Sequence, residues 1–405
     1  MIAEIGYGQL KFLDDGDFVK AVFLRNYWFR IPKGELLKIG RFRLTGKGLA
    51  FSGVAQGSAE RKLNFLVEKC FGSLTNSFTG KKTVYIHRNS GIPLTGNTAF
   101  GIVYRNTNVI EVKPVTGCNL DCVYCSIDEG AGSGKKNDFL IEKDYILDEI
   151  KKLADFIGGE WHCHIGTHGE PLIYPELEGL IEGISGIKNV KSISMDTNAT
   201  ILTEKKAEEL INAGLTRFNI SLDSLGEELA ARMAGCAYSA ERVKKLICAI
   251  GKKHDVLIAP VWVKGWNDAE IERIVKFALA HCPKSRIKLG IQNFLEYARG
   301  RRPAKQMPWK EFYGKLRELE RKYSTKLVLS ADDFGIRKAK ALPKPFKKGQ
   351  VVRAVVMCEG MYKGEKVCVS GGRSINVFGC GKKAGSFVNV KILRDKHNCF
   401  AGKAS

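Results

Sequence analysis

The stretch NVIEVKPVTGCNLDCVYC, residues 108–125, decides the fold, because it joins a strand-forming run to a group of cysteines. Residues 108–114 alternate in polarity and predict a β-strand. The loop that follows carries Cys118, Cys122 and Cys125 in a C-x3-C-x2-C spacing. Cysteine thiolates are the standard ligands of iron–sulfur clusters. We therefore expect these three residues to be metal ligands and the catalytic centre, converging on one face of a cubane cluster and leaving one iron open.

Zinc is the main alternative for this loop. A structural zinc site takes four ligands, usually from two C-x2-C units. The chain has 12 cysteines but no second C-x2-C unit. Zinc completed by a distant ligand, or buried cysteines without a metal, therefore remain the weaker alternatives.

The residues after the cysteine loop alternate between strand-like and helix-like patterns. Such alternation is typical of βαβ units and a parallel sheet. Six units are fewer than the eight of a closed barrel, so we expect an α/β fold with a partial (β/α)6 TIM-like barrel over residues 108–335. The predicted strands are 108–114, 160–165, 190–196, 217–222, 256–263 and 288–295, and the predicted helices are 141–156, one capped by Thr203, 240–252, 268–280 and 309–323.

Two segments of different character flank this region. Residues 1–107 are rich in glycine and contain aromatic runs, which predict a mostly-β accessory domain with strands at 18–23, 27–31 and 83–87. The stretch 342–345 (LPKP) predicts a linker. Residues 345–405 contain short apolar runs separated by glycines, a pattern typical of a small antiparallel β-barrel. These runs are 351–357, 366–370, 374–378 and 387–393.

The cysteine loop and the positions after it resemble the radical S-adenosylmethionine (radical SAM) superfamily over roughly residues 111–300. The resemblance implies a 4Fe–4S cluster whose open iron chelates S-adenosylmethionine and cleaves it reductively to a 5′-deoxyadenosyl radical. It further implies that Tyr124 lies beside the adenine, and that Gly169, Glu170 and Pro171 receive the methionine amino group. His168 departs from the family pattern, in which glycine is common at that position.

Polar residues at later strand ends fit the same resemblance. Active sites of parallel α/β folds lie at the carboxyl ends of the strands. Asn198, Ser221 and Asp223 resemble the family's contacts to the ribose and the methionine carboxylate, although serine and aspartate there would also cap helices. Asn267 lies in a stretch that resembles the family's lining of the adenine pocket. The alternative is that it caps the N-terminus of the following helix. Residues 292–293 (QN) either face the substrate or satisfy hydrogen bonds within the core.

Several other candidates have plainer interpretations. His162, Cys163 and His164 alternate along a strand, so Cys163 faces away from the two histidines and a three-ligand metal site is not expected there. The basic run 299–303 (RGRRP) predicts either phosphate contacts near the barrel mouth or a solvated loop. Four C-terminal cysteines lack paired spacing and predict small buried hydrophobes rather than an auxiliary cluster: Cys358, Cys368, Cys380 and Cys399.

The positive charge of the chain is unevenly distributed. The formal net charge is +22, of which residues 1–110 carry +9 and residues 336–405 carry +13, while residues 111–335 are neutral. A neutral body between basic flanks predicts binding to a polyanion. The C-terminal segment resembles the TRAM type of RNA-binding domain, an OB-type barrel, so the whole chain resembles an archaeal-type Fe–S oxidoreductase.

These observations predict a cytoplasmic radical SAM transferase that inserts a methyl or sulfur group into tRNA or rRNA. The alternative is modification of a residue in an acidic protein, including cobalamin-dependent C-methylation, and a third is a non-enzymatic iron–sulfur or zinc RNA-binding protein. Methylthiolation is disfavoured, because residues 1–110 hold Cys70 alone. An electron donor such as ferredoxin or flavodoxin is expected. No apolar run of transmembrane length and no signal peptide is present, so no membrane partner is expected.

Overall fold

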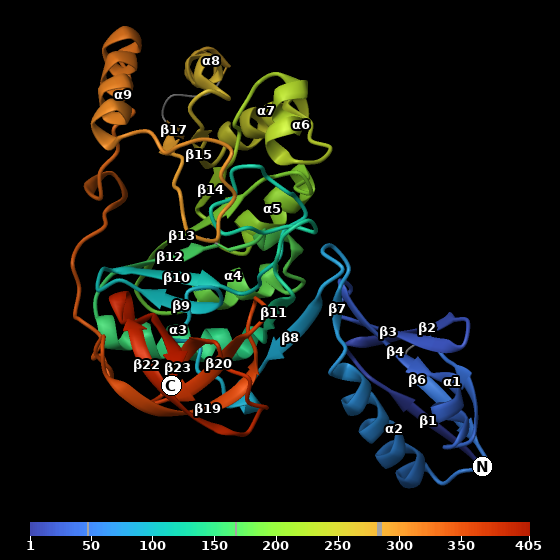
Figure 1. The fold of residues 1–405 in the computed structure, drawn as a ribbon. Helices are drawn as coiled ribbons and strands as arrows, with labels where there is room; N and C mark the ends of the chain where they lie inside the picture. Colours follow the sequence, from blue (N-terminus) through green and yellow to red (C-terminus); the bar gives the residue numbers. More distant parts are fainter. Residues whose placement is uncertain (47, 167, 282–285) are drawn as a thin grey trace.

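The computed structural model describes residues 1–46, 48–166, 168–281 and 286–405, and it has a central sheet with a lobe below on each side (Figure 1). All strands of the central sheet pair in parallel except the edge strand at residues 101–104, which is antiparallel to its neighbour. The α/β class is thus confirmed. The strands are β9 (Gly101–Tyr104), β10 (Val109–Lys113), β12 (Trp161–Ile165), β13 (Val190–Thr197), β14 (Arg217–Ile220), β15 (Asp255–Ile258) and β17 (Ile287–Leu289), in the order β17-β15-β14-β13-β12-β10-β9.

Helices follow these strands and bury one apolar face each. In the helix at residues 143–157, Ile146, Ile150 and Leu153 are buried at helical spacing. The predicted cap is confirmed, since the Thr203 hydroxyl accepts a hydrogen bond from the Lys206 backbone N–H at 3.1 Å. The helices are α3 (Lys143–Ile157), α4 (Leu177–Ser185), α5 (Glu204–Asn212), α6 (Glu227–Ala234), α7 (Ala240–Gly251), α8 (Asp268–His281) and α9 (Trp309–Tyr323).

Two predicted strands, 256–263 and 288–295, are each broken in the middle. The first divides into β15 and β16 (Val261–Trp262), and the second into β17 and β18 (Gln292–Asn293). β16 and β18 form a separate two-stranded parallel sheet. Pro260 lies in the first break, and it has no N–H to donate to a neighbouring strand. The break turns the Val261 backbone N–H towards Asp223 instead.

The N-terminal lobe is built from short strands and one long helix, α2 (Gln56–Phe71), which was not predicted. The helix buries Ala59, Leu63 and Leu66 against the strands. The strands and the short helix of this lobe are β1 (Ile2–Gly6), β2 (Leu10–Asp15), β3 (Phe18–Phe23), β4 (Tyr27–Pro32), α1 (Lys33–Leu37), β5 (Arg41–Leu44), β6 (Gly48–Ser52), β7 (Thr75–Asn76) and β8 (Lys82–Ile86).

Strand pairing crosses the predicted domain boundary between residues 107 and 108 in both directions. β9 precedes the boundary but pairs with β10 in the central sheet. β11 (Asn137–Ile141) follows it but pairs in parallel with β8, at the edge of a six-stranded sheet ordered β11-β8-β7-β4-β3-β2. The predicted helix 141–156 accordingly starts two residues later, at Lys143, because Ile141 ends β11.

The C-terminal lobe is a closed five-stranded barrel with its own buried apolar core, ordered β19-β20-β21-β23-β22. All four predicted runs are strands of this barrel. A fifth strand at residues 400–404 was not predicted, and it pairs in parallel with the strand at 373–378, so the barrel is not entirely antiparallel. The strands are β19 (Val351–Glu359), β20 (Glu365–Ser370), β21 (Arg373–Phe378), β22 (Phe387–Arg394) and β23 (Phe400–Ala404).

Backbone contacts attach the barrel to the segment that precedes β9. The Ser374 N–H donates to the Thr95 carbonyl at 3.1 Å, and the Phe400 N–H donates to the Gly96 carbonyl at 2.7 Å. Gly96 has φ +121°, and a Cβ there would lie 2.2 Å from the Ser374 carbonyl oxygen. Only glycine permits this approach.

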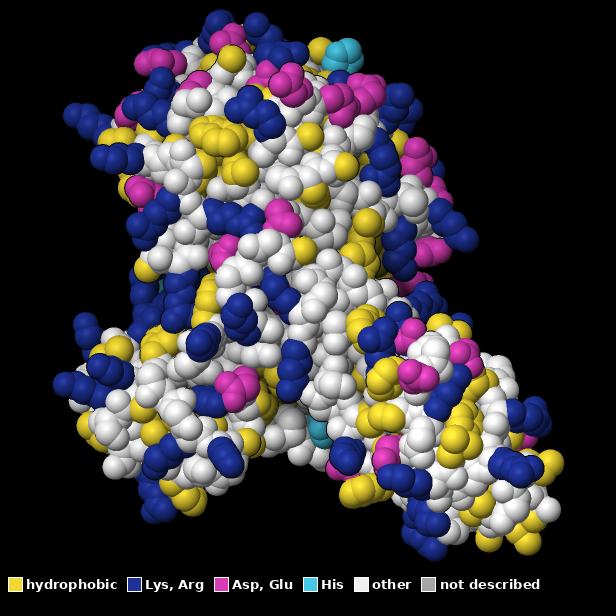
Figure 2. Space-filling model, turned by 45° about the vertical axis from the view of Figure 1, so that its right-hand side comes forward, with side chains coloured by type: hydrophobic (Ala, Val, Ile, Leu, Met, Phe, Trp, Pro, Cys, Tyr) yellow, Lys and Arg dark blue, Asp and Glu magenta, His cyan; other side chains and the backbone are white. Residues whose placement is uncertain are grey.

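Charged side chains are distributed over the surface as the sequence count implies. Figure 2 shows Lys and Arg side chains (dark blue) spread over both lower lobes, while most Asp and Glu side chains (magenta) lie on the upper body. Within the described residues, no helix is both long and apolar enough to cross a membrane.

Gly96→Ala should loosen the barrel from the body. The new methyl group would overlap the Ser374 backbone, and overpacking of this kind costs about 1–3 kcal/mol. Gly385→Ala is the matched control, since Gly385 also has positive φ (+83°) but open space around the missing Cβ. We expect the Gly96 variant to melt several degrees below the Gly385 variant and to release the barrel earlier in limited proteolysis. Equal melting temperatures would contradict the close approach.

Candidate functional site

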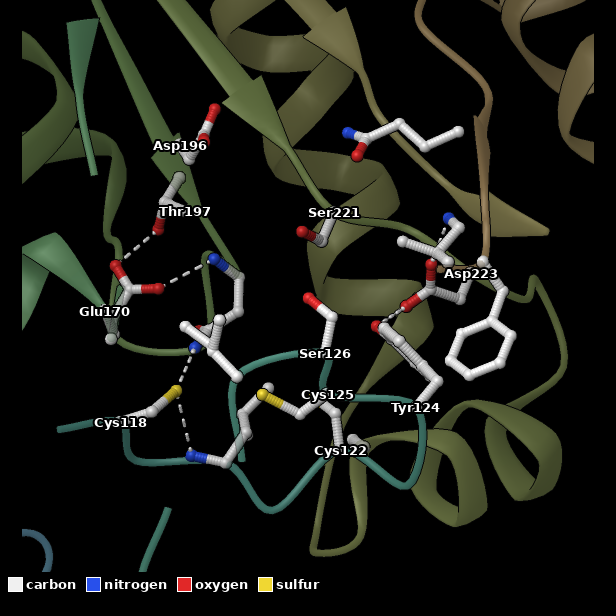
Figure 3. Close-up of a pocket in the computed structure, with 18 of the residues that line it drawn as sticks. Cys118, Cys122, Tyr124, Cys125, Ser126, Glu170, Asp196, Thr197, Ser221 and Asp223 are labelled. Atoms are coloured by element: carbon white, nitrogen blue, oxygen red, sulfur yellow. Dashed lines mark hydrogen bonds between the residues drawn. The ribbon is translucent and has the colours of Figure 1, made fainter. Parts of the chain in front are cut away.

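The three cysteines lie on the segment that joins β10 to β11, residues 114–136, which we call the cluster loop. Cys118, Cys122 and Cys125 all line one cavity of about 260 Å³ at the carboxyl ends of the central strands (Figure 3). Burial raises the pKa of the Cys118 and Cys122 thiols well above the usual value. Thiolate formation there requires a compensating positive charge, which a metal centre supplies.

Hydrogen-bond donors already point at two of the sulfurs. The Leu120 N–H lies 3.5 Å from the Cys118 Sγ, and the Glu129 N–H lies 3.3 Å from the Cys125 Sγ. The Asn198 side-chain amide approaches the Cys118 Sγ at 3.8 Å. Donors to sulfur are characteristic of the surroundings that tune iron–sulfur clusters.

The three cysteines at the cavity match an iron–sulfur site by residue type. Thiolates are the standard ligands of such clusters, and three of them leave one iron open. Cys118, Cys122 and Cys125 all line the cavity, so they fit a 4Fe–4S cluster in kind and number. Within the parts of the chain that the structure describes, no three Cys, His, Asp or Glu side chains are arranged to hold a single metal ion.

One arginine holds the cluster loop in shape. The Arg301 guanidinium donates to the Cys122 carbonyl at 3.1 Å and also to the Asp121 carbonyl. Its other contacts are the Asp121 carboxylate at 2.9 Å, the Asp128 carboxylate at 2.9 Å and the Glu129 carbonyl at 3.0 Å. All its nitrogens are thus used on the loop, and the fork geometry needed for this is unique to arginine.

The backbone completes this attachment. The Arg301 N–H donates to the Cys125 carbonyl at 2.9 Å. On the other side of the loop, the Asp121 and Val123 N–H groups donate to the last residues of α6, each at 3.0 Å. Arg301 and α6 therefore hold the ligand-bearing segment from both sides.

Glu170 lies at the start of a short 3-10 helix after β12 and is 2% exposed. Its carboxylate accepts hydrogen bonds from the Leu172 N–H at 3.0 Å, the Thr197 hydroxyl at 2.8 Å and the Asn198 N–H at 2.8 Å. Burial raises the pKa of Glu170 to about 7, although these hydrogen bonds favour its charged form. A carboxylate has about four lone-pair directions, so one remains for a cationic ligand.

Gly169 brings Glu170 close to the cluster loop. It has φ +73°, and a Cβ there would lie 2.2 Å from the Gly117 carbonyl oxygen. The Glu170 N–H donates to the same Gly117 carbonyl at 3.0 Å. Pro171 fills the first position of the 3-10 helix and does not line the cavity.

Asp223 and Tyr124 form the opposite wall of the cavity. The Tyr124 hydroxyl donates to one carboxylate oxygen of Asp223, and the Val261 N–H donates to the other at 2.8 Å. Burial raises the pKa of Asp223 to about 6, although both hydrogen bonds favour its charged form. The Asn267 side chain donates to the Asp223 and Val261 carbonyls, each at 2.9 Å, so it lies behind this wall and not in the cavity.

The structure brings most of the expected site residues to one cavity. Pro171 and Asn267 support its wall from behind, and the residues that line it are Cys118, Cys122, Tyr124, Cys125, Gly169, Glu170, Asn198, Ser221 and Asp223. Gln292 and Asn293 also line it. The roles of these residues towards a cofactor stay predictions.

Sequence reasoning missed the role of Arg301. The basic run 299–303 was expected to contact phosphates or solvent, whereas Arg301 is turned inward onto the cluster loop. Its partners lie about 180 residues earlier, and the run itself carries no signal for them. Ser126 and Asp196 also line the cavity and had not been singled out.

Both histidines of β12 have hydrogen-bond partners on the neighbouring strand β13. His162 Nδ1 lies 2.7 Å from the Ser192 hydroxyl, and His164 lies 3.0 Å from Ser194 and 3.1 Å from Asp196. Cys163 faces the opposite way and is buried. In the C-terminal barrel, Cys368, Cys380 and Cys399 are buried, and Cys358 is half-buried.

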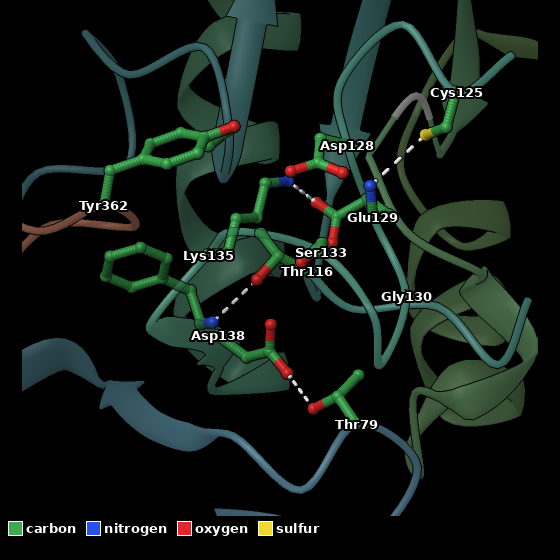
Figure 4. Close-up of polar contacts among 12 residues, drawn as sticks. Thr79, Thr116, Cys125, Asp128, Glu129, Gly130, Ser133, Lys135, Asp138 and Tyr362 are labelled. Atoms are coloured by element: carbon green, nitrogen blue, oxygen red, sulfur yellow. Dashed lines mark hydrogen bonds and ion pairs between the residues drawn. The ribbon is translucent and has the colours of Figure 1, made fainter. Parts of the chain in front are cut away.

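A buried polar network continues beyond Cys125 (Figure 4). Lys135 and Glu129 form an ion pair with 1% and 4% of their side chains exposed. Asp138 accepts hydrogen bonds from Thr79 at 2.5 Å and Asn76 at 2.9 Å. Breaking a buried ion pair is strongly destabilising, so this network fixes the far end of the cluster loop against the N-terminal lobe.

Known proteins match this chain over the region that holds the site. A family model described as the Radical SAM superfamily matches residues 112–278. The uncharacterized protein MJ0103 of Methanocaldococcus jannaschii is 35% identical over 83% of this chain and 84% of that protein. The GTP 3′,8-cyclase of Listeria welshimeri is 36% identical, and the match spans 44% of this chain and about half, 51%, of the cyclase. The crystal structure of Streptococcus suis SuiB bound to S-adenosylmethionine aligns with a TM-score of 0.42 and 13% identity over 79% of this chain and 69% of that one.

Arg301→Lys should weaken the cluster site without removing a ligand. Lysine keeps the charge but loses the fork that binds four loop residues at once. Loss of such supporting contacts typically costs about 10–100-fold in metal affinity. Iron and sulfide content after anaerobic reconstitution would measure this loss. Arg302→Lys is the control, because Arg302 is exposed and its side chain donates to the Tyr297 carbonyl, away from the cluster loop. Equal iron content in both variants would show that Arg301 does not position the ligands.

Proposed function

This chain belongs to the radical SAM superfamily, and on that premise we propose that it cleaves S-adenosylmethionine at a 4Fe–4S cluster and modifies tRNA or rRNA by inserting a methyl or sulfur group. The observation that carries the RNA proposal is the placement of the closed, basic C-terminal barrel beside the cluster loop. The Lys136 N–H donates to the Met361 carbonyl of the barrel at 2.7 Å. A nucleic acid bound to the barrel would therefore reach the cluster cavity.

The side chains of the cavity fit the cofactors that the family implies. Cys118, Cys122 and Cys125 would hold the cluster, which when bound supplies the electron that breaks a sulfur–carbon bond of S-adenosylmethionine. Glu170, held in place by three donors, would accept the methionine amino group at its remaining lone pair. Tyr124 would pack beside the adenine while its hydroxyl stays on Asp223.

The apolar part of the lining would protect a reactive intermediate from water. Leu120, Ala230, Ala234 and Phe294 line the cavity and are nearly fully buried. Exclusion of water prevents side reactions of reactive groups. Ser221 and Gln292 supply polar atoms within this apolar wall.

The barrel has the character of a nucleic-acid-binding module. Small five-stranded barrels of the OB type bind oligonucleotides with the loops between strands one and two and between strands four and five. Here these loops are residues 360–364 and 395–399. Exposed basic side chains surround them and cover the barrel, among them Lys347, Lys348, Lys363, Lys382, Lys383, Lys391, Arg394 and Lys396.

A matched relative also points to nucleotide chemistry. By its name, the GTP 3′,8-cyclase acts on a guanine nucleotide, and it is 36% identical over 44% of this chain. Since the match spans half of that enzyme, it supports the class of substrate and not the same reaction. Modification of a protein residue with cobalamin is the alternative, and a corrinoid spectrum in the purified protein would favour it.

Cys122→Ala should abolish formation of 5′-deoxyadenosine from S-adenosylmethionine and dithionite, because one iron of the cluster would lose its ligand. Anaerobically reconstituted protein and chromatographic detection of the nucleoside would measure this. Cys70→Ala is the control, since Cys70 lies at the end of α2 in the N-terminal lobe. Wild-type turnover by the Cys122 variant would refute the cluster assignment, and an inactive wild-type protein would refute the enzyme itself.

RNA binding should depend steeply on salt. If about six phosphates are contacted, affinity falls by about a thousandfold between about 50 and about 200 mM salt, because counterions are released from the RNA. Total tRNA and the reconstituted full chain would be compared in filter binding. A flat salt dependence, or retention of acidic protein but not tRNA, would contradict RNA as the substrate. Mass spectrometry of tRNA from a strain without the gene would then identify the modified base.

A further inference from the structure

A second cavity lies between the edge of the central sheet, the cluster loop and the C-terminal barrel. Its volume is about 520 Å³, within the range of small-molecule sites. Lys113 of β10 and His168 line it from the body, and the barrel lines it with both the 360–364 and the 395–399 loop. We call it the interdomain cavity.

The interdomain cavity adjoins the cluster cavity. Ser126, Ile127 and Leu295 line both of them. Ser126 follows Cys125 directly, so the shared wall lies beside one of the cluster ligands. A molecule in the interdomain cavity would therefore have one end within reach of the chemistry.

The lining of the interdomain cavity is strongly basic. It includes five Lys or Arg side chains but Glu365 as its sole carboxylate among the described residues, and Glu365 pairs with Arg299 at 3.3 Å. Lys135 is paired with Glu129. No carboxylate of the described residues lies within ion-pair distance of Lys113 or Arg394, which leaves two cations without an acidic partner.

Lys113 stands out because it is 4% exposed and its ammonium donates to the Thr98 carbonyl. An ammonium has three N–H donors, and this bond occupies one of them. Burial lowers the pKa of Lys113 to about 8, against the opposing effect of Glu111. An unpaired buried charge is costly unless a ligand of opposite charge compensates it.

His168 adds a further unsatisfied group to this place. Its Nδ1 is buried and has no hydrogen-bond partner among the described residues. Burial lowers the pKa of His168 well below the usual value, and the nearby charges of Lys113 and Lys135 lower it further. Lys113, Lys135 and His168 line the same cavity, and Lys113 has N–H donors left for an anion.

Aromatic side chains lie beside these cations. Tyr297 is 52% exposed, and Tyr362 of the 360–364 loop lines the same cavity. Arg299 packs 4.2 Å from the Tyr362 ring and 4.6 Å from the Phe378 ring. Cations for a phosphate together with aromatic rings for a base are the combination by which proteins bind single nucleotide units.

We propose that the interdomain cavity binds one phosphorylated nucleoside unit of the substrate, with its phosphate against Lys113 and its nucleoside directed towards the opening at Ser126. This rests on the proposed function, because it places the unit to be modified next to the cluster. The unit is either a free nucleotide or a nucleotide turned out of an RNA chain. Both present the same phosphate to Lys113.

Lys113→Met tests this proposal, because methionine keeps the apolar stem and removes the charge. Reconstituted full-length protein would be titrated with the four nucleoside 5′-monophosphates, the four nucleosides and total tRNA. We expect at least one monophosphate to bind the variant about tenfold or more weakly than the wild type, as loss of a charge-assisted hydrogen bond implies. Nucleoside binding should not change. Lys151→Met on α3 is the control, since Lys151 is exposed and outside both cavities.

The outcomes separate the sources of the ligand. A defect with monophosphates and tRNA indicates a nucleotide pocket that also accepts RNA, and a defect with tRNA alone indicates a nucleotide turned out of the chain. Equal binding by wild type and variant overturns the proposal. If Lys113→Met fails to fold, as judged by circular dichroism, Arg394→Met at the exposed rim takes its place with the same expected result.

The wild-type protein distinguishes failure of this inference from failure of the proposed function. Suppose that the wild type forms 5′-deoxyadenosine, and that wild type and Lys113 variant bind the monophosphates, the nucleosides and tRNA equally well. The cavity assignment is then wrong, and the enzyme class stands. If the wild type forms no 5′-deoxyadenosine, the proposed function fails whatever the cavity binds.

Discussion

The arrangement of the site depends on one guanidinium group. Arg301 gathers the Asp121, Cys122, Asp128 and Glu129 segments of a loop that has no regular secondary structure. Three ligands on a loop hold a cluster only when the backbone between them is fixed, since an entropic cost of about 1–2 kcal/mol attaches to each residue that must be ordered. In the same short run of sequence, Arg299 packs on Tyr362 of the barrel and Arg301 binds Asp128 of the cluster loop. The connection after β18 thus contacts both the barrel and the loop that carries the three cysteines.

The sequence was sufficient for the α/β class, which follows from local order. The resemblance of the cysteine loop and the later strand ends to a known family supplied most of the residues that meet in the cluster cavity. Polar residues at the ends of parallel strands must come together at one edge of a sheet. Contacts between distant segments could not be predicted from the sequence. β11 joins the N-terminal sheet, and Arg301 contacts residues about 180 positions earlier in the chain. Helix α2 was also missed. Periodicity describes a segment's own faces and does not identify the segment across from it.

The charge count by segment agreed with the basic surface of the two lobes, but it did not reveal the charges buried inside the body. The neutral balance of residues 111–335 hides Lys113 and Lys135, whose exposure is 4% and 2%. Glu129 neutralises Lys135 directly, whereas Lys113 has no carboxylate within ion-pair distance among the described residues. The segment total is therefore neutral although the lining of the interdomain cavity is basic. The buried cations come from residues 111–335, whose formal charges sum to zero, and the barrel adds Arg394 from the basic tail.

The two ends of the cluster loop belong to different sheets. β10 starts it in the central sheet, and β11 ends it in the sheet of the N-terminal lobe. A rotation of that lobe against the body is therefore transmitted to Cys118, Cys122 and Cys125 through the covalent backbone, whereas motion of the C-terminal barrel reaches them through side chains and hydrogen bonds. The stiffness of the N-terminal lobe against the body would therefore set how constant the spacing of these three cysteines stays.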